Sequence, residues 1–467
     1  MEFSDPTLAS TPHDLPRHDP PPARLLRGAR VFDGRWWQDD WSVRTGSDGR
    51  IAEAGPGLTP RAGEETADLD GLWLLPGLVD CHVHFREPGL VRKEGYATGS
   101  LGALHGGVTT VCEIQNNPPL MISADLLREK RAALTGVSRV DFVPYGSLVE
   151  ESLPHLAAMR GLTPAVKCFL GCSTGAGGVD DEATMRRWFA AAARAGLPIV
   201  AHCEDNHALA AAARALPPEL ADRHDLNRPP EAEIRSIEDA LRVAREVGAR
   251  LHVFHISTAE GARRVRAAAA AGQAVSGSTA PHYLLVTAEE AHALPLNRFK
   301  VNPSIKYAAD RDGLCEQVAC GALCAIGTDH APHPLEEKDR RYAKAPSGFP
   351  SVDLLLPLIV AVRDRQGVKL DALLRAVTSG PAQEFRLARK GRIAPAMDAD
   401  LVIVDPTQER VVEESLLPSK SKWSPYRGWR LRAFPQRVLL RGHEVWAAGA
   451  AVGPPRGRPL PDPSILL

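Results

Sequence analysis

The sequence lacks long apolar runs and lacks a net charge of either sign. Its 56 lysines and arginines nearly balance its 57 aspartates and glutamates, which gives a formal charge of −1 over 467 residues. No segment approaches the roughly 20 consecutive apolar residues of a membrane-spanning helix, and no basic stripe indicates a nucleic-acid surface. We therefore expect neither a membrane nor a nucleic acid among its partners.

Further absences exclude other classes of protein. The first 23 residues contain no apolar core, which favours a disordered arm over a signal peptide. The eight cysteines lie mostly within apolar segments and lack paired zinc-site spacing, which is typical of reduced thiols in a cytoplasmic protein. No glycine-rich phosphate loop follows an early strand, although a dinucleotide-binding sheet would require one.

The amino-acid composition is typical of a globular protein, with 44% apolar and 24% charged residues. Between residues 76 and 389, β-like segments alternate with alanine-rich helical segments. This alternation predicts a parallel sheet, and eight such units predict a closed (β/α)8 barrel, an α/β fold of the TIM type. The strands are expected at residues 79–85, 108–114, 140–146, 165–170, 198–203, 250–256, 274–280 and 324–329.

Short β-like segments occur near both ends of the chain, within residues 25–75 and again within 400–448. We interpret them as one small composite β domain, formed by residues 24–75 and 390–452. This domain brackets a catalytic barrel of residues 76–389. A disordered arm is predicted before the first part of the β domain, at residues 1–23. A proline-containing tail is predicted after the second part, at residues 453–467.

The most informative motif is the histidine pair at residues 82 and 84. Residues two apart in a strand share a face, so both imidazoles point to the same side. Catalytic groups of such a barrel lie at the C-terminal ends of its strands. Other predicted strands carry further groups near that end. The complete set is His82, His84, Lys167, His202, His255 and Asp329.

Each of these residues has a plain structural alternative, such as a hydrogen-bonded core histidine, a salt-bridged lysine or a capping aspartate. One cause, a two-metal hydrolytic site, explains all six together. Nitrogen and oxygen donors suit zinc, and Mn, Fe, Co and Ni also accept ligands of these types. An ammonium has no lone pair, so Lys167 fits only if carbon dioxide carboxylates its amine to a carbamate that bridges both ions.

Arg86 follows the histidine pair on the same face of the strand. Its guanidinium could hold the carboxylate of an anionic substrate. The alternative is an ion pair with Asp80 or Glu87. The segment 338–349 is a candidate to line the same site.

Eight motifs occur in order along the chain: P-G-L-V-D-C-H-V-H-F-R-E-P-G, H-G-G-V-T-T, V-K-C-F-L-G-C-S-T-G, A-H-C-E-D, H-V-F-H-I-S-T, A-P-H-Y-L-L, K-V-N-P-S-I-K and A-I-G-T-D-H-A-P-H. With them the chain resembles the amidohydrolase superfamily, and within it the dihydroorotases, from about residue 25 to 452. The resemblance implies a metal-dependent barrel with a small β domain. It also implies the reversible cyclisation of N-carbamoyl-L-aspartate to L-dihydroorotate in pyrimidine biosynthesis.

The resemblance implies a role for each candidate residue. It assigns the first metal to His82, His84 and Asp329, and the second to His202 and His255. Lys167 is then the carboxylated bridge, and Asp329 also carries the proton. The chain departs from the family pattern at residues 114–119 and 302–306, around two expected substrate contacts. The expected substrate-binding residues are Arg86, Asn116, Asn302 and His333.

The nearest alternative functions use the same metal site with a different cyclic amide as substrate. They are those of an allantoinase, a dihydropyrimidinase or a hydantoinase. Their substrates lack the ring carboxylate of dihydroorotate, so Arg86 and Asn302 are the distinguishing residues. A non-catalytic scaffold of the dihydroorotase type is a different class, and it would be expected to lose metal ligands. The expected partner is a small-molecule substrate, carbamoyl-aspartate or dihydroorotate, and a homo-oligomer is compatible with this interpretation.

Overall fold

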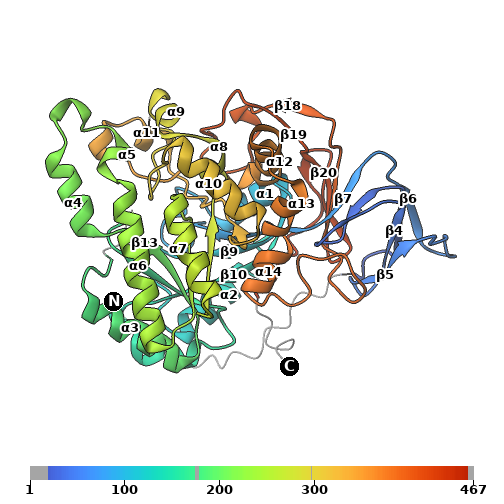
Figure 1. The fold of residues 1–467 in the computed structure, drawn as a ribbon. Helices are drawn as coiled ribbons and strands as arrows, with labels where there is room; N and C mark the ends of the chain where they lie inside the picture. The colour runs from blue at the N-terminus through green and yellow to red at the C-terminus, as the bar shows by residue number, and fades with distance from the viewer. Residues whose placement is uncertain (1–18, 174–177, 296, 461–467) are drawn as a thin grey trace, which may run out of the picture.

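The chain folds around a closed barrel of parallel strands (Figure 1). The computed structural model describes residues 19–173, 178–295 and 297–460. The barrel strands are β8 (Leu78–Val83), β9 (Val108–Glu113), β10 (Asp141–Pro144), β11 (Gly146–Ser147), β12 (Val166–Leu170), β13 (Ile199–Cys203), β14 (Leu251–Val253), β15 (Val275–Thr279) and β16 (Ala325–Ile326).

Pairing between neighbouring strands is parallel throughout the barrel. β10 and β11 are two parts of one strand on either side of Tyr145. The ring closes where β16 contacts β8 and where Val83 forms a parallel bridge with His330. The predicted α/β fold, a (β/α)8 barrel, is therefore confirmed.

Two barrel strands are shorter than predicted, and both end just before a candidate functional residue. The predicted strand 250–256 contains only β14, and the predicted strand 324–329 contains only β16. Beyond these strands, His255 and Asp329 have φ angles of 38° and 50°. A left-handed backbone cannot continue a β ladder, so the chain leaves the sheet and bends at these residues.

Helices cover the outside of the barrel (Figure 1). α3 (Glu182–Ala195) begins where the Asp181 carboxylate accepts a hydrogen bond from the Thr184 backbone N–H. α6 (Pro230–Val247) has proline in its first turn and ends at Gly248, whose φ is 69°. Other helices are α1 (Tyr96–His105), α2 (Ala124–Leu134), α4 (Asn206–Ala215), α5 (His224–Asn227), α7 (Ala259–Ala270), α8 (Pro281–Leu285), α9 (Ala288–Ala293), α10 (Ala308–Ala319), α11 (Leu335–Lys338), α12 (Leu355–Gln366), α13 (Leu370–Ala376) and α14 (Ser379–Glu384).

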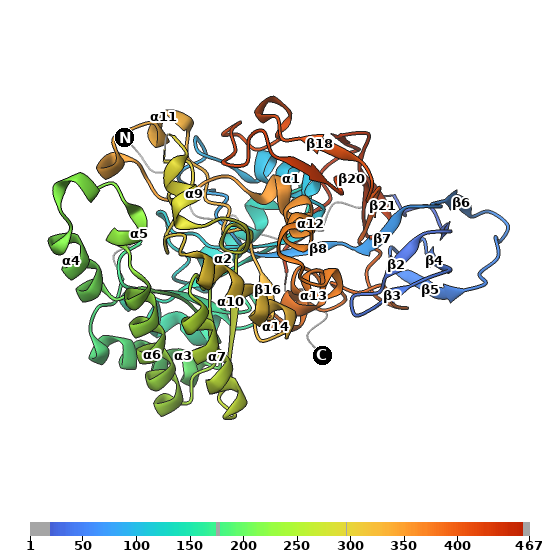
Figure 2. The ribbon, with the colours of Figure 1, turned by 45° about the horizontal axis from the view of Figure 1, so that its top comes forward.

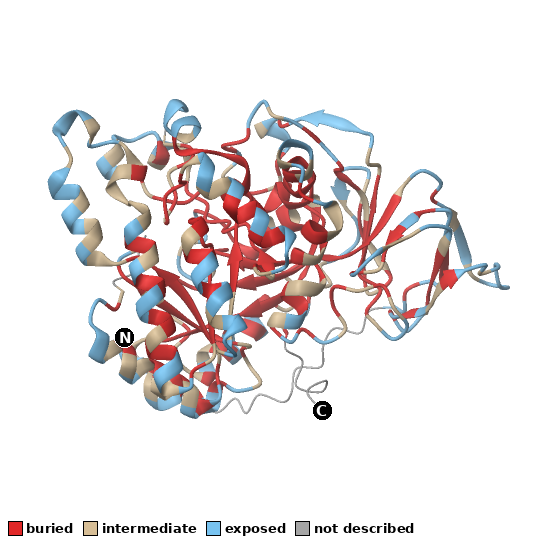
Figure 3. Ribbon diagram, in the orientation of Figure 1, coloured by how far each residue is buried: buried red, intermediate tan, exposed pale blue. Residues whose placement is uncertain are grey.

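Short 3-10 helices lie between several of these elements. They are η1 (Glu150–Met159), η2 (Pro218–Leu220), η3 (Tyr342–Lys344), η4 (Val352–Leu354) and η5 (Glu414–Leu416). Figure 3 shows the barrel strands buried, while exposed positions lie on the outer turns of the surrounding helices. None of the helices in the described ranges is both long enough and apolar enough to cross a bilayer.

Strands from both ends of the chain share a second sheet, which lies beside the barrel (Figure 2). Its order is β22-β21-β20-β17-β7-β2-β3, so β7 from the first part pairs with β17 from the last part. A four-stranded sheet, β5-β4-β1-β6, and the pair β18-β19 complete the β structure. The bounds are β1 (Arg24–Arg27), β2 (Arg30–Phe32), β3 (Trp37–Gln38), β4 (Trp41–Thr45), β5 (Ile51–Pro56), β6 (Glu65–Asp68), β7 (Trp73–Pro76), β17 (Leu401–Val404), β18 (Glu409–Val411), β19 (Arg430–Arg432), β20 (Pro435–Leu440), β21 (His443–Ala447) and β22 (Ala450–Ala451).

The exact domain bounds remain a prediction. Of the predicted terminal segments, residues 1–18 of the arm and 461–467 of the tail lie outside the described residues.

A buried cluster of charges joins the barrel to the β sheets. The Lys390 ammonium lies 2.6 Å from a carboxylate oxygen of Asp141 on β10, 2.9 Å from Asp398 and 2.6 Å from Asp400. Arg441 adds a second cation, 2.6 Å from Asp141. Arg389 is a third cation, 2.9 Å from Asp398. Among the described residues Asp400 forms an ion pair with Lys390 alone, so removal of Lys390 would leave a buried carboxylate without an ion-pair partner.

We expect Lys390→Met to lower the free energy of unfolding by about 3–5 kcal/mol, the cost of breaking a buried ion pair on one side. Urea denaturation of the two proteins measures the difference. The exposed residue Lys344 provides the control, since Lys344→Met removes the same charge without uncovering a buried partner. A loss below about 1 kcal/mol, as for an exposed pair, would show that the cluster does not hold the two parts together.

Candidate metal centre

A cavity opens at the rim of the barrel that is formed by the C-terminal ends of the strands. Lys167 reaches it from β12 and His202 from β13, while other lining residues follow β8, β9, β14 and β16. The structure brings nearly all of the predicted site residues together around this cavity. Those that line it are His82, His84, Arg86, Asn116, Lys167, His202, His255, Asn302 and Asp329.

The first group of donors converges on a single point. The Nε2 atoms of His82 and His84 lie 3.2 Å apart, and each lies 3.3 Å from Oδ1 of Asp329. His84 Nδ1 donates to the Ile114 carbonyl at 3.0 Å, which leaves the lone pair of Nε2 facing the other two donors. This arrangement suits a divalent metal, because all three residues offer one free donor atom each.

The charge states of this group also suit a metal. Burial lowers the pKa of His82 well below its usual value and lowers that of His84, so both imidazoles are neutral near pH 7. Burial alone would raise the pKa of Asp329, but hydrogen bonding to His84 and the neighbouring His255 and His282 bring it down to about 2. Neutral imidazoles and an ionised carboxylate are the protonation states that metal binding requires.

A second group lies on the other side of the cavity. His202 Nδ1 lies 3.2 Å from His255 Nε2, and the two rings are close, with centroids 4.9 Å apart. The ring of His255 is also 5.1 Å from that of His82, which belongs to the first group. Four imidazoles therefore lie around one cavity, as a centre for two metal ions requires.

Lys167 is buried between these two groups. Its Nζ has no hydrogen-bond partner within the described part of the chain, and it lies 4.7 Å from the ring centroids of Phe169 and Phe254. Burial lowers its pKa to about 7, against the smaller opposing effect of Asp329. An amine that is partly neutral near pH 7 is a nucleophile for carbon dioxide. Its orphaned position among the metal donors therefore fits a carboxylated lysine.

Sequence reasoning missed a carboxylate behind His202. A carboxylate oxygen of Glu204 lies 3.0 Å from His202 Nε2, and Arg228 forms an ion pair with the same carboxylate. Burial alone would raise the pKa of Glu204, but Arg228 and His202 hold it well below its usual range. Glu204 thus fixes which ring nitrogen of His202 faces the cavity. The available signal was the spacing of two, which places both side chains on one face.

We expect Glu204→Gln to weaken binding of the second metal by about 10- to 100-fold, as for other outer partners of metal-binding histidines. Glutamine keeps an acceptor but removes the charge that stabilises the proton on Nε2. Competition with a metal chelator measures the affinity. Glu219→Gln, at an exposed position in η2, should leave it unchanged. Equal metal affinities in the two variants would show that Glu204 does not support metal binding.

Asp80, considered from the sequence only as an ion-pair partner for Arg86, instead joins the first and last barrel strands. Its carboxylate accepts hydrogen bonds from the backbone N–H of Thr328 at 3.0 Å and from its hydroxyl at 2.5 Å. It also accepts from the backbone N–H of His82 at 3.2 Å. These bonds tie the segment before Asp329 to the strand that carries the histidine pair.

Three residues of the cavity have left-handed backbone conformations. The φ angles are 66° at Arg86, 38° at His255 and 50° at Asp329. Such conformations cost of the order of 1–3 kcal/mol each in residues with a side chain, and they cluster at functional sites. The surrounding hydrogen bonds therefore hold these three side chains at positions that the free chain would avoid.

Arg86 faces the cavity without an acidic partner. Its Nη1 donates to Asn116 Oδ1 at 2.6 Å, and its buried Nε has no hydrogen-bond partner in the ranges that the structure describes. Among the described residues it forms no ion pair, because Glu87 accepts from the Tyr96 backbone and Asp80 from Thr328. Burial lowers its pKa only to about 10, so a full positive charge faces the cavity near pH 7.

Of the remaining expected substrate contacts, Asn302 lines the cavity and His333 does not. Asn302 Oδ1 lies 3.1 Å from His224 Nε2. His333 lies behind Ser347, with Nε2 3.2 Å from the Ser347 carbonyl and Nδ1 2.8 Å from the Lys93 ammonium. Ser347 and Gly348, from the predicted lining segment 338–349, do reach the cavity. A direct role for His333 in binding substrate stays a prediction.

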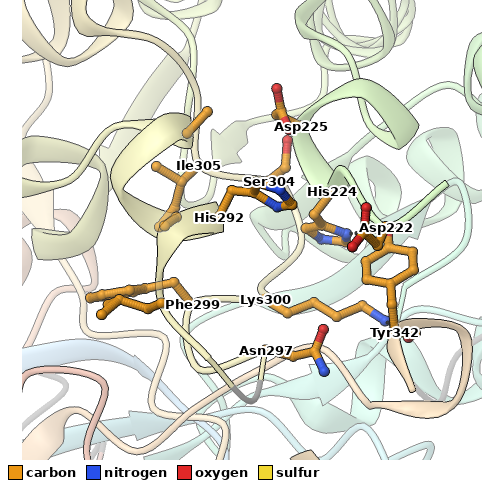
Figure 4. A pocket seen from close by; sticks show the side chains of 13 residues that line it. Asp222, His224, Asp225, His292, Asn297, Phe299, Lys300, Ser304, Ile305 and Tyr342 are labelled. Atoms are coloured by element: carbon orange, nitrogen blue, oxygen red, sulfur yellow. Dashed lines mark hydrogen bonds between the residues drawn. The ribbon is translucent and has the colours of Figure 1, made fainter. Parts of the chain in front are cut away.

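Figure 4 shows a side pocket of about 270 Å³, which shares wall residues with a wider hollow that Asn302 and Ser347 of the cavity also line. His224, Lys300 and Tyr342 line both this pocket and the wider hollow above the cavity. His224 Nδ1 lies 2.7 Å from the Tyr342 hydroxyl, while its Nε2 faces Asn302. His224 therefore connects the side pocket to the wall of the cavity.

The barrel and its centre of histidine, lysine and aspartate define a class of protein, the metal-dependent hydrolases of amides. Residues 73–429 match the amidohydrolase family, and the chain belongs to this family. The prediction of a cyclic amide hydrolase is thereby confirmed.

The chain is similar to relatives with several names over most of its length. The chain is 36% identical to a dihydroorotase of Halobacterium salinarum over 425 residues, which are 91% of this chain and 96% of that protein. It is 34% identical to an allantoinase of Rubrobacter xylanophilus over 444 residues, 93% of this chain and 96% of that protein. The L-hydantoinase (dihydropyrimidinase) of Arthrobacter aurescens matches with a TM-score of 0.87 at 26% identity, over 93% of this chain and 99% of that structure.

Proposed function

We propose that the protein is a dihydroorotase, which interconverts N-carbamoyl-L-aspartate and L-dihydroorotate in pyrimidine biosynthesis. The observation that carries this proposal is Arg86, a buried cation that faces the cavity with no acidic partner among the described residues. A buried charge without a counter-ion is costly. A substrate carboxylate bound there would offset that cost.

The geometry favours a carboxylate over a neutral group. Arg86 Nη1 is already bonded to Asn116, so the guanidinium is held in one orientation, while its Nε has no partner among the described residues. A guanidinium binds a carboxylate through two parallel hydrogen bonds, which a neutral ring carbonyl cannot provide. Asn302 lines the same cavity and can add a donor to the ring.

Two divalent metal ions, with zinc expected, would supply Lewis acidity for the amide carbonyl and activate the attacking water. His82, His84 and Asp329 would hold the first, and His202 and His255 the second, with carboxylated Lys167 between them. Asp329, whose pKa is about 2, is ionised and can take a proton from the water. It then passes this proton to the ring nitrogen as the amide opens.

A second candidate function, allantoinase, is favoured by the relative of that name at 34% identity. Allantoin and the dihydropyrimidines are cyclic amides without the ring carboxylate of dihydroorotate. In an enzyme for these substrates, Arg86 would have no anion to bind. Assay of carbamoyl-aspartate, dihydroorotate, allantoin and dihydrouracil with one preparation separates the two functions. Turnover of allantoin or dihydrouracil alone would overturn the proposal.

We expect Arg86→Met to lower kcat/KM for dihydroorotate by about 100-fold, because two charged hydrogen bonds to the substrate carboxylate are lost. Steady-state kinetics with dihydroorotate measure this. Arg92→Met is the matched control, since the Arg92 side chain is 62% exposed and pairs with Glu337 outside the cavity. If both variants kept normal activity, the carboxylate would not be bound at Arg86.

The proposal includes a cytoplasmic location and a small-molecule substrate, and it is compatible with a homo-oligomer. It also includes zinc as the metal and a carbamate on Lys167. The presence of the full donor set argues against a non-catalytic scaffold.

A further inference from the structure

A second group of mixed donors lies at the opposite end of the barrel. It consists of His252 on β14, Cys324 directly before β16 and Glu384 at the end of α14. One donor atom from each residue lies within 4.8 Å of the other two. Cys324 precedes the strand that Asp329 follows, so this group and the catalytic cavity lie at opposite ends of the same parallel strands.

The histidine of this group is held in place by its surroundings. Its Nε2 lies 3.0 Å from the Ser278 hydroxyl, and its Nδ1 lies 2.8 Å from the Ser276 hydroxyl and 3.9 Å from Glu384 Oε1. The ring contacts Phe254 and Phe385 at centroid distances of 5.1 and 5.3 Å. Each ring nitrogen thus contacts a serine hydroxyl, and the Glu384 carboxylate lies just beyond hydrogen-bond distance of Nδ1, so a cation bound at Nδ1 would take the place of Ser276.

The other two donors can be reached from outside the barrel. The Glu384 side chain is 17% exposed, and Cys324 is half-buried as a free thiol. The only cation near the carboxylate is Arg250, whose Nη2 lies 3.4 Å from Glu384 Oε1 and whose side chain is 34% exposed, counting described residues alone. Arg250 can therefore turn towards solvent when another cation takes its place. α14 contacts both β8 and β16, so the group sits where this helix closes the barrel (Figure 2).

We propose that His252, Cys324 and Glu384 form a separate binding site for one thiophilic divalent cation, of which Zn²⁺ is the expected example. Neutral imidazole, thiolate and carboxylate are all zinc donors, and water would complete a tetrahedral set. On binding, the Cys324 S–H bond breaks, its proton passes to water, and the sulfur bonds to the metal. Thiolate and carboxylate then neutralise the two positive charges, which suits a partly buried position.

The site has a structural consequence that does not depend on the proposed catalytic function. A bound ion would connect β14, the start of β16 and α14, which are otherwise joined by packing and by the pair of Arg250 with Glu384. Because the ion binds only the folded arrangement, it would also stabilise the protein by mass action. Its affinity should fall as the pH falls, because a proton competes for the thiolate.

Cobalt(II) distinguishes this site from the catalytic centre. The catalytic donors are nitrogen and oxygen only, so an intense near-ultraviolet thiolate-to-cobalt absorption can arise only from a cysteine. Titration of the metal-stripped full-length protein with Co²⁺ should produce this band. It should be absent in Cys324→Ser and kept in Cys172→Ser and Cys320→Ser, where exposed thiols are removed. Cys324→Ser should retain the hydrolase activity of the loaded enzyme.

A second measurement uses the unaltered protein. Zn²⁺ should protect Cys324 from alkylation, read by mass spectrometry of its peptide, while the exposed Cys172 stays reactive. A titration in which cobalt fills the catalytic centre but no thiolate band appears would overturn the proposal. A band that persists in Cys324→Ser, or equal alkylation of Cys324 with and without Zn²⁺, would overturn it as well.

Discussion

Lys167→Ala is expected to lose nearly all turnover, by at least about 100-fold, the upper end of what loss of a metal-supporting group costs. Lys167 lies buried among the metal donors and has no hydrogen-bond partner among the described residues, a position that a carboxylated side chain would explain. Removing it takes away both oxygens expected to bridge the metals. Metal content and kcat should therefore fall together, and both are measured on the same preparation.

The cavity left by the alanine provides a sharper test. Short carboxylic acids such as acetate or propionate can occupy that space and present two oxygens where the carbamate stood. We expect partial rescue of activity that depends on the concentration and length of the acid. Lys344→Ala, at an exposed position, should neither lose activity nor respond to the acids. Full activity of Lys167→Ala without any acid would exclude the bridging role.

Asp329→Asn is expected to have the second large effect, a fall in kcat of about 10²- to 10⁴-fold, the range for loss of a general acid–base group. Asparagine keeps one oxygen towards His82 and His84 but cannot accept the proton of the attacking water. Binding of dihydroorotate should largely survive, because Arg86 and Asn302 are unchanged. Equilibrium binding and steady-state kinetics separate the two effects.

The control for this variant is Asp339→Asn, at an exposed position after α11, which should behave as the unaltered protein. Near-normal turnover of Asp329→Asn would show that Asp329 does not transfer the proton. A loss of substrate binding as large as the loss of turnover would instead assign it to binding alone.

The barrel could be predicted from the sequence because its signals are local. Eight apolar segments separated by helical ones fix the order of strands, and the period of two within a strand puts His82 and His84 on one face. Since every parallel strand ends at the same rim, residues as distant as Lys167 and Asp329 could be assigned to one cavity. The structure places both of them there.

Contacts that depend on packing between distant segments could not be predicted. No local pattern shows that Arg228 forms an ion pair with Glu204, or that Lys390 contacts Asp141 across the boundary between barrel and β sheet. Likewise, His333 follows Asp329 by four residues, yet the loop places its ring behind Ser347 instead of in the cavity wall. The left-handed residues that follow β14 and β16 make these two strands shorter than the pattern of apolar residues predicts.

The central claim is that donors from separate strands meet around a pair of metal ions at one rim of the barrel. Anomalous X-ray diffraction at the zinc absorption edge, from crystals grown with zinc and bicarbonate, tests it most directly. We predict two peaks roughly 3.5–4 Å apart, one beside His82, His84 and Asp329 and one beside His202 and His255, with density for a carbamate on Lys167 between them. Absence of any peak among these six side chains in zinc-saturated crystals would contradict the account.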